Sequence, residues 1–239
     1  MKKSDITRKI INSICMLLCT FTLAMLITFW VDGDEASKEV PSPLPTPEAT
    51  QEIAQNGFTI VIDAGHGGKD CGAVSPGGTI ESALNLEVAK ELEQILTKTG
   101  FKIIMTRTDE NALGSTKSED MKKRKEIMNT PHVDAVVSVH MNKFSDSSVS
   151  GPMVFYMQGS EAGQKLAECA IESICTRLER PTRSANPGDY FVIRESEAPA
   201  IIVECGFLSN SEDERLLLTK EHRLCLAEGI ADGVSKFFS

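Results

Sequence analysis

The chain has 239 residues, 41% of them hydrophobic, which is typical of a globular protein with one sizeable core or two small ones. Its formal net charge of −9 argues against nucleic acid as a partner, because binding to phosphates requires basic patches. A neutral or weakly charged polymer, such as a glycan, remains compatible with this charge.

Residues 1–31 predict a cytoplasmic flank followed by a transmembrane anchor. Lysine and arginine are concentrated in the first nine positions, and residues 14–31 carry no charge. A stretch of roughly 17–25 apolar residues spans a bilayer, and the basic flank predicts an N-terminus in the cytoplasm with the rest of the chain outside. The alternative is a cleaved signal peptide, which would make the protein secreted. We favour the uncleaved anchor because the apolar run is long and lacks a small-x-small cleavage site.

Residues 32–56 predict a proline-rich linker. Four prolines alternate with other residues between positions 41 and 47. Such a segment favours extended polyproline geometry and cannot form a core. The remaining residues, 57–239, have the size of one domain.

The cysteines predict neither a disulfide framework nor a zinc ribbon. Two of the seven, Cys15 and Cys19, lie in the predicted anchor. The others are odd in number and irregular in spacing, and no C-x-x-C occurs. We expect most of them to be small core residues, although a pairing of Cys169 with Cys175 stays open.

Strands alternate with helices along residues 57–239. Short apolar runs predict strands at 58–63, 101–106, 134–140, 151–157 and 198–205. Helical spacing of apolar residues, or a charged helical stretch, predicts helices at 81–100, 118–129, 161–178, 211–218 and 221–238. This alternation implies an α/β fold with a mostly parallel sheet that helices cover on both faces.

Side chains capable of chemistry stand where three of the predicted strands end. Asp63 ends the first strand and His66 follows it, His140 ends the third and Asn142 follows it, and Glu204 ends the last apolar run. The working site of a parallel sheet lies at the carboxyl ends of its strands. If these strands are parallel neighbours, the groups meet at one edge.

His66 and His140 are candidate metal ligands. Two histidines and a carboxylate with one open position form a common catalytic zinc set, and Glu81 is the candidate carboxylate because it begins a predicted helix on its buried stripe. Glu81 could instead only interact favourably with the helix dipole. That role explains a glutamate at the start of a helix but not one that faces inward. We expect the other two histidines, His132 and His222, to be solvated.

Glu204 follows the apolar run AIIV at residues 200–203. A carboxylate in that place is costly to bury without a partner. A salt bridge would be an ordinary partner, whereas a water beside zinc would make Glu204 the general base of a hydrolase. The dinucleotide fingerprint, the Walker A loop and the G-x-S-x-G motif of serine hydrolases are all incomplete or absent.

Seven segments together resemble the zinc-dependent N-acetylmuramoyl-L-alanine amidases of the amidase type 3 family. In chain order they are VIDAGHGGKDCGA, ESALNLEVAKELEQIL, IIMTRTD, DMKKRKEIMN, DAVVSVHMN, GPMVFYM and APAIIVECGFLSN. They follow the order of the family, and the resemblance extends over essentially all of residues 58–239. It implies that residues 57–239 form a zinc amidase catalytic domain. The departures are small: Met128 precedes Asn129 where the family usually has alanine, and Cys71 occupies a variable loop position.

The resemblance implies an α/β fold with a mixed, largely parallel sheet. It places His66, Glu81 and His140 on the zinc ligands and Glu204 on the catalytic glutamate. The implied reaction is hydrolysis, by zinc-activated water, of the amide bond between N-acetylmuramic acid and the L-alanine of the peptidoglycan stem peptide. Arg194 matches a position near the family's cleft, where it would contact substrate or form a surface ion pair. Asn142 is the second expected substrate contact.

The anchor, the linker and the bare catalytic domain also resemble the amidases that act in the spore cortex, where removal of stem peptides precedes muramic-lactam formation. The resemblance therefore implies an extracytoplasmic domain on the cell-wall or cortex side of a membrane, during sporulation. An activating protein partner is compatible with the sequence but is not identified by it. The alternatives are a non-catalytic module that binds peptidoglycan or recruits another enzyme, and a zinc peptidase that cuts within the stem peptide.

Overall fold

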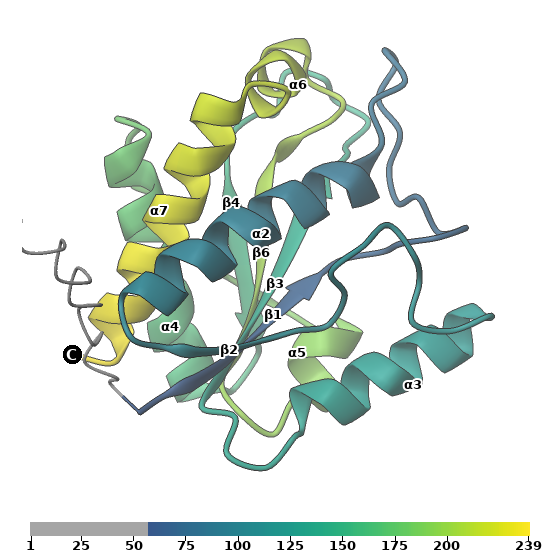
Figure 1. The fold of residues 1–239 in the computed structure, drawn as a ribbon. Helices are drawn as coiled ribbons and strands as arrows, with labels where there is room; N and C mark the ends of the chain where they lie inside the picture. The colour runs from purple at the N-terminus through teal and green to yellow at the C-terminus, as the bar shows by residue number, and fades with distance from the viewer. Residues whose placement is uncertain (1–56) are drawn as a thin grey trace, which may run out of the picture. The chain divides into compact units, whose positions relative to one another are not determined.

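A six-stranded sheet forms the centre of the computed structural model, which describes residues 57–239 (Figure 1). Its strands are β1 (Thr59–Ala64), β2 (Lys102–Met105), β3 (Ala135–Asn142), β4 (Met153–Met157), β5 (Asn186–Gly188) and β6 (Ala200–Phe207). They lie in the order β2-β1-β3-β6-β4-β5. All neighbours pair in parallel except β4 and β6, which are antiparallel. The mixed, largely parallel sheet predicted above is thus confirmed.

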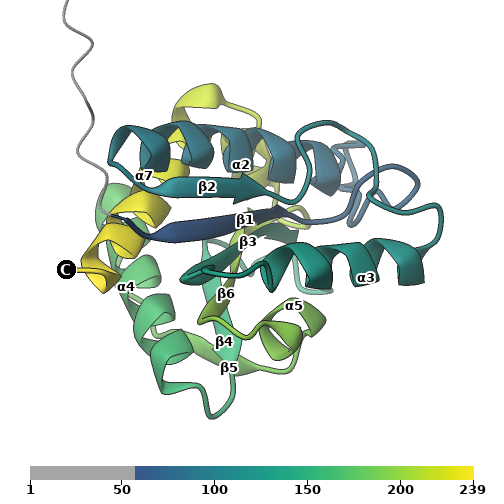
Figure 2. The ribbon, with the colours of Figure 1, turned by 60° about the horizontal axis from the view of Figure 1, so that its bottom comes forward.

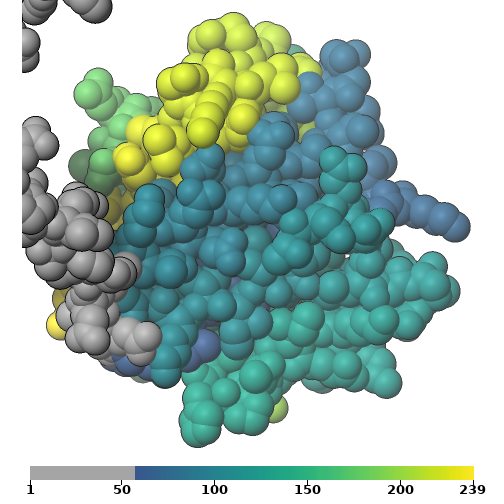
Figure 3. All heavy atoms as spheres, in the orientation of Figure 1, coloured from purple at the N-terminus to yellow at the C-terminus, as the bar shows by residue number. Residues whose placement is uncertain are grey.

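Helices cover both faces of the sheet. They are α2 (Glu81–Lys98), α3 (Lys117–Met128), α4 (Glu161–Arg177), α5 (Phe191–Glu195), α6 (Ser211–Leu217) and α7 (Lys220–Phe237). Figure 2 shows α3 and α5 on the side opposite α4 and α7. The helices α2 and α7 pack against each other, and their atoms lie side by side on the surface seen in Figure 3.

Strand β1 is apolar at almost every position because helices cover both of its faces. Ile60 and Ile62 are fully buried among residues of α2, α4 and α7. Val61, between them, is equally buried but packs with Met128 of α3 and Val192 of α5. Successive side chains of a strand point to opposite faces, so a strand that is covered on both sides needs apolar residues at every position.

The strands and helices expected from periodicity are all present, with ends shifted by a few residues. The structure adds β5 and α5, which the sequence did not predict. The five cysteines within residues 57–239 are free, so Cys169 and Cys175 form no disulfide.

The predicted anchor and linker, residues 1–56, lie outside the described residues. Among the helices between residues 57 and 239, none is long and apolar enough to cross a membrane. The anchor and the domain boundary at residue 57 therefore remain predictions.

Candidate active site

The parallel neighbours β1, β3 and β6 bring the expected side chains to one edge of the sheet. His66 follows β1, and His140 lies in β3 directly across from Glu204 in β6. Glu81 is the first residue of α2. The four side chains expected at the strand ends and at the helix start therefore lie at the same edge of the sheet.

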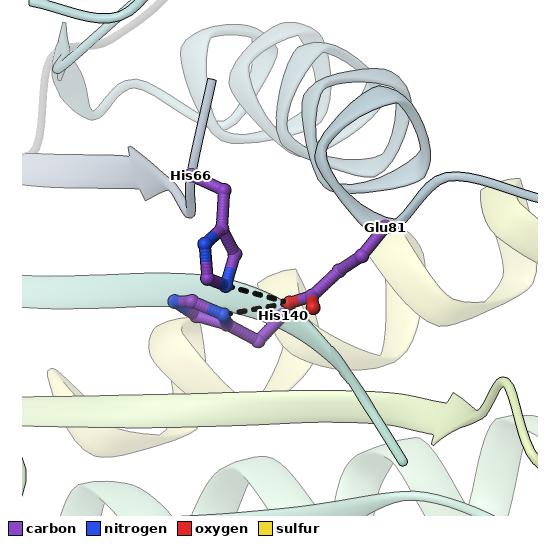
Figure 4. A group of neighbouring side chains, drawn as sticks. All are labelled: His66, Glu81 and His140. Atoms are coloured by element: carbon purple, nitrogen blue, oxygen red, sulfur yellow. Dashed lines mark hydrogen bonds and ion pairs between the residues drawn. The ribbon is translucent and has the colours of Figure 1, made fainter. Parts of the chain in front are cut away.

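His66, Glu81 and His140 point at one another (Figure 4). Oε1 of Glu81 lies 3.3 Å from Nε2 of His66 and 2.9 Å from Nδ1 of His140. Their ligand atoms all lie within 4.8 Å of one another. Two imidazole nitrogens and one carboxylate oxygen are the donor set of many catalytic zinc sites, so these residues fit a zinc ion.

Two glycines make room for these side chains. A side chain at Gly65 would collide with the ring of His140. A side chain at Gly72 would meet the carboxylate of Glu81, and Gly72 also has a left-handed φ of 67°. At Gly72 only glycine combines this backbone conformation with so close an approach. The contact of Gly65 with the ring of His140 explains the glycine directly before His66.

The loop before α2 fixes the inward orientation of Glu81. The first amides of the helix, those of Glu81 and Ser82, donate to the carbonyls of Ala73 and Cys71. Ala73 in turn donates its amide to Oε2 of Glu81 at 2.7 Å. The side chain is only 5% exposed, so it faces the site rather than the solvent at the helix end.

Glu81 is held in its ionised form. Burial opposes ionisation, but hydrogen bonds with His140 and His66 outweigh it and hold the pKa of Glu81 well below its usual range. A carboxylate that stays charged in a buried place needs a cationic partner. Both the charge and the geometry of Glu81 therefore suit a metal ligand.

Glu204 has a different environment from Glu81. Its Oε2 atom is buried and has no hydrogen-bond partner among the described residues. Burial raises the pKa of Glu204 to about 7. A general base is most effective when its pKa lies near the working pH, and an unpaired buried oxygen calls for a partner that comes from outside the protein, such as water or substrate.

A cavity of about 350 Å³ joins these groups to the surface. It is lined by His66, Glu81, His140 and Glu204 together with Asn142, Lys143 and Tyr190, among others. Asn142, an expected substrate contact, therefore reaches the cavity, and its Oδ1 accepts the amide hydrogen of Lys143 at 2.8 Å. Tyr190 was not predictable from the sequence, because a single aromatic residue in a loop belongs to no periodic pattern.

Arg194 lies in a different setting from Asn142. Its guanidinium pairs with Asp189 at 2.7 Å and with Glu195 at 3.2 Å, and it is not among the residues that line the cavity. The surface ion pair that the sequence left open for Arg194 is thus present. A substrate contact by Arg194 remains a prediction.

The remaining expectations concern Asp63 and the two other histidines. Asp63 is buried, accepts hydrogen bonds from Thr106, Ser138 and Arg124, and lines a small second cavity together with His66 and His140. His132 and His222 do not belong to the metal-binding group found within residues 57–239.

A family model described as N-acetylmuramoyl-L-alanine amidase matches residues 60–236. The "Probable cell wall amidase LytH" of Staphylococcus epidermidis is 30% identical over 215 residues, which are 88% of this chain and 67% of that protein. The protein of the same name from Staphylococcus aureus is 32% identical over 185 residues, or 77% of this chain and 59% of that protein. The chain thus spans about two thirds or less of the length of these relatives.

Solved structures show the same fold. The CwlD amidase from Clostridioides difficile, in complex with the GerS lipoprotein, matches with a TM-score of 0.73 and 30% identity, over 75% of this chain and 98% of that one. An N-acetylmuramoyl-L-alanine amidase from Clostridium difficile 630 matches with a TM-score of 0.71 and 32% identity, over 77% and 97% of the two chains.

Proposed function

Because the chain belongs to the N-acetylmuramoyl-L-alanine amidase family, we propose that His66, Glu81 and His140 hold a zinc ion for its reaction. The chain is a peptidoglycan hydrolase that cleaves the amide bond between N-acetylmuramic acid and the L-alanine of the stem peptide. The convergence of one carboxylate oxygen and two imidazole nitrogens beside an unpaired glutamate carries the proposal. When bound, zinc would polarise the scissile carbonyl and ease the ionisation of a nearby water.

The surrounding residues orient the two histidines. Oδ1 of Asp70 lies 3.0 Å from Nδ1 of His66. This contact keeps the proton of the ring on Nδ1 and leaves the lone pair of Nε2 directed at the site. The ring of His140 lies against Gly65, which limits its rotation and keeps Nδ1 directed at Glu81.

Glu204 moves the proton. Its free carboxylate oxygen accepts a proton from the attacking water, whose oxygen bonds to the carbonyl carbon. The same carboxyl then delivers the proton to the nitrogen of the leaving L-alanine as the carbon–nitrogen bond breaks. The products are the carboxylate of the muramic acid lactyl group and a free amino-terminal stem peptide.

Product analysis tests the bond that is cut. After digestion of peptidoglycan by the protein, mass spectrometry is expected to detect free stem peptides that begin with L-alanine, and muramic acid that lacks it. A peptidase acting within the stem peptide would leave L-alanine on the muramic acid. A binding module would release no fragment at all, so either of these results would exclude an amidase.

We further propose a role in spore cortex maturation. The similarity to the CwlD amidase supports this role, as do the anchor and linker expected from the sequence. That amidase was solved in complex with the GerS lipoprotein, so we propose a lipoprotein as a candidate partner of this chain. Spores of a deletion strain would lack muramic lactam if the role is correct and would keep it otherwise.

The location of the domain follows from the substrate. Peptidoglycan lies outside the cytoplasm, and we propose that the uncharged run at residues 14–31 anchors the chain there. Protease added to intact protoplasts is expected to remove the catalytic domain, because the basic flank orients the N-terminus inward. A mature protein whose first residue lies beyond Trp30 would show instead that the segment is cleaved.

A further inference from the structure

Two buried arginines lie beneath the active site, outside the cavity that Glu204 lines. Arg124 borders a second cavity of about 150 Å³, on the other side of His66 and His140. Arg107 follows β2 and is 4% exposed, and Arg124 lies in α3 and is 2% exposed. Arg124 pairs with Asp63 and with Asp120. Arg107 forms no ion pair within residues 57–239, since all the hydrogen bonds of its guanidinium go to main-chain carbonyls.

This arrangement is expensive in free energy. Burial and, after it, the neighbouring charge of Arg124 lower the pKa of Arg107, and the opposing effect of the nearby Asp63, Asp109 and Asp120 is too small to reverse this shift. A buried charge without a carboxylate partner contributes little to stability, and apolar residues of similar size often pack as well or better. What a guanidinium does provide is a rigid fork of donors in fixed directions.

The carbonyls that the two arginines bind belong to the segments that carry the metal ligands. Arg107 donates Nε to the carbonyl of Ala64 at 2.9 Å and Nη2 to that of Gly65 at 2.9 Å. The same Nη2 donates to the carbonyl of Ser82, next to Glu81, at 2.8 Å. One nitrogen thus ties the loop that carries His66 to the first turn of the helix that carries Glu81.

Arg124 completes the set from α3. Its Nη1 donates to the carbonyl of Ala64 at 2.9 Å, and its Nη2 donates to the carbonyl of His66 itself at 2.5 Å. His66 has a left-handed φ of 60°, which is uncommon for a residue other than glycine. Three consecutive carbonyls therefore face two guanidinium groups, which compensate the strained turn at the ligand.

We propose that Arg107 and Arg124 are positioning residues for the metal centre. By holding the carbonyls of residues 64–66 and of Ser82, they fix His66 and Glu81 at the separation at which both reach one ion. This inference rests on the proposed zinc site. The two arginines would raise the affinity of that site for zinc without touching the metal or the substrate.

Arg107→Lys in the full-length protein is the direct test. Lysine keeps the charge but replaces the fork by one ammonium, which cannot reproduce the bridge between Gly65 and Ser82. Zinc affinity, measured by competition with a chelator, is expected to fall about 10–100-fold, the usual cost of losing a residue that orients a metal ligand. The visible absorption spectrum of the cobalt(II)-substituted protein is expected to change, since it reports the ligand geometry.

Arg223→Lys is the matched control. Arg223 is a partly buried arginine of α7 that donates to the carbonyl of Leu217 at 2.7 Å and pairs with Glu87, but it has no hydrogen bond to residues 64–66 or to Ser82. This variant is expected to lower the unfolding temperature of the metal-free protein and to leave zinc affinity and the cobalt spectrum unchanged. Arg107→Lys binding zinc as tightly as the unchanged protein, with the same cobalt spectrum, would overturn the inference.

Two further variants separate the possible failures. Arg124→Lys keeps a cation beside Asp63 and is expected to weaken zinc binding in the same way as Arg107→Lys. If both lysine variants unfold without metal, the arginines determine the fold, and the inference is wrong. His66→Ala reports on the ligand set itself: if it binds zinc like the unchanged protein, the proposed function fails and not merely the role of the arginines.

Discussion

Replacing Glu204 with glutamine is expected to slow amide hydrolysis by at least about 10²–10⁴-fold, the usual contribution of a positioned general base. Glutamine keeps the shape of the side chain and a carbonyl oxygen, but it cannot accept the proton of the attacking water. The loss should be larger still if the same carboxyl also protonates the leaving nitrogen. Initial rates on purified peptidoglycan, with release of stem peptides as the signal, measure the effect.

The fold should survive this replacement. The pKa of Glu204 is raised by burial to about 7 from an ordinary value of 4.5. Between these two values the folded protein binds more protons at Glu204 than the unfolded chain, so ionisation of Glu204 lowers stability as the pH rises. A neutral amide removes that effect. The metal-free Glu204→Gln protein should therefore unfold at the same temperature as the unchanged protein, or at a higher one, above pH 7.

Removal of a histidine ligand is expected to abolish zinc binding at working concentrations. With His66→Ala or His140→Ala, only two protein ligands remain, and a catalytic zinc site normally has three. The affinity should fall by more than the ~10–100-fold that follows loss of an orienting residue. Zinc content after dialysis and competition with a chelator both measure this loss.

The structure supplies a matched control for His66→Ala. His132 also has a left-handed backbone, with φ of 71° against 60° for His66. Alanine at either position carries a similar conformational penalty. His132→Ala and His222→Ala are expected to bind zinc normally, so a loss confined to His66 and His140 comes from the missing ligand. Stoichiometric zinc in the His66→Ala, His140→Ala double variant would refute the assignment.

Much of the fold could be predicted because its central strands are buried on both faces. The runs that became β1, β3 and β6 are apolar at nearly every position, and their order in the sheet brings the chemistry to one edge. The antiparallel direction of β4 was not predictable from its own sequence, because direction depends on pairing with β6. The elements β5 and α5 span three and five residues, too few for any periodicity to be visible.

Some residues of the candidate site could likewise be predicted from the sequence, and others could not. His66, His140 and Glu204 could be found because each stands at the end of an apolar run, and Glu81 because it begins an amphipathic helix. The residue pattern alone left Glu81 between a ligand and a helix-dipole role, and only the resemblance favoured the ligand. Arg107 was not found, because its partners are carbonyls of residues distant in sequence, such as Gly65 and Ser82. Main-chain partners leave no signal in side-chain identity.

The mechanism requires the two glutamates to have different roles, one as a metal ligand and one as the general base. The most direct test is to measure zinc content and amide cleavage side by side on Glu81→Gln and Glu204→Gln. Glu81 is a charged group whose oxygen faces two imidazole nitrogens, so a neutral amide there should cost the protein its zinc. Glu204 has an unpaired oxygen in the same cavity, so its amide variant should keep zinc and lose cleavage. Zinc lost from Glu204→Gln but retained by Glu81→Gln would mean that the roles are exchanged, and undiminished cleavage by both variants would contradict the mechanism.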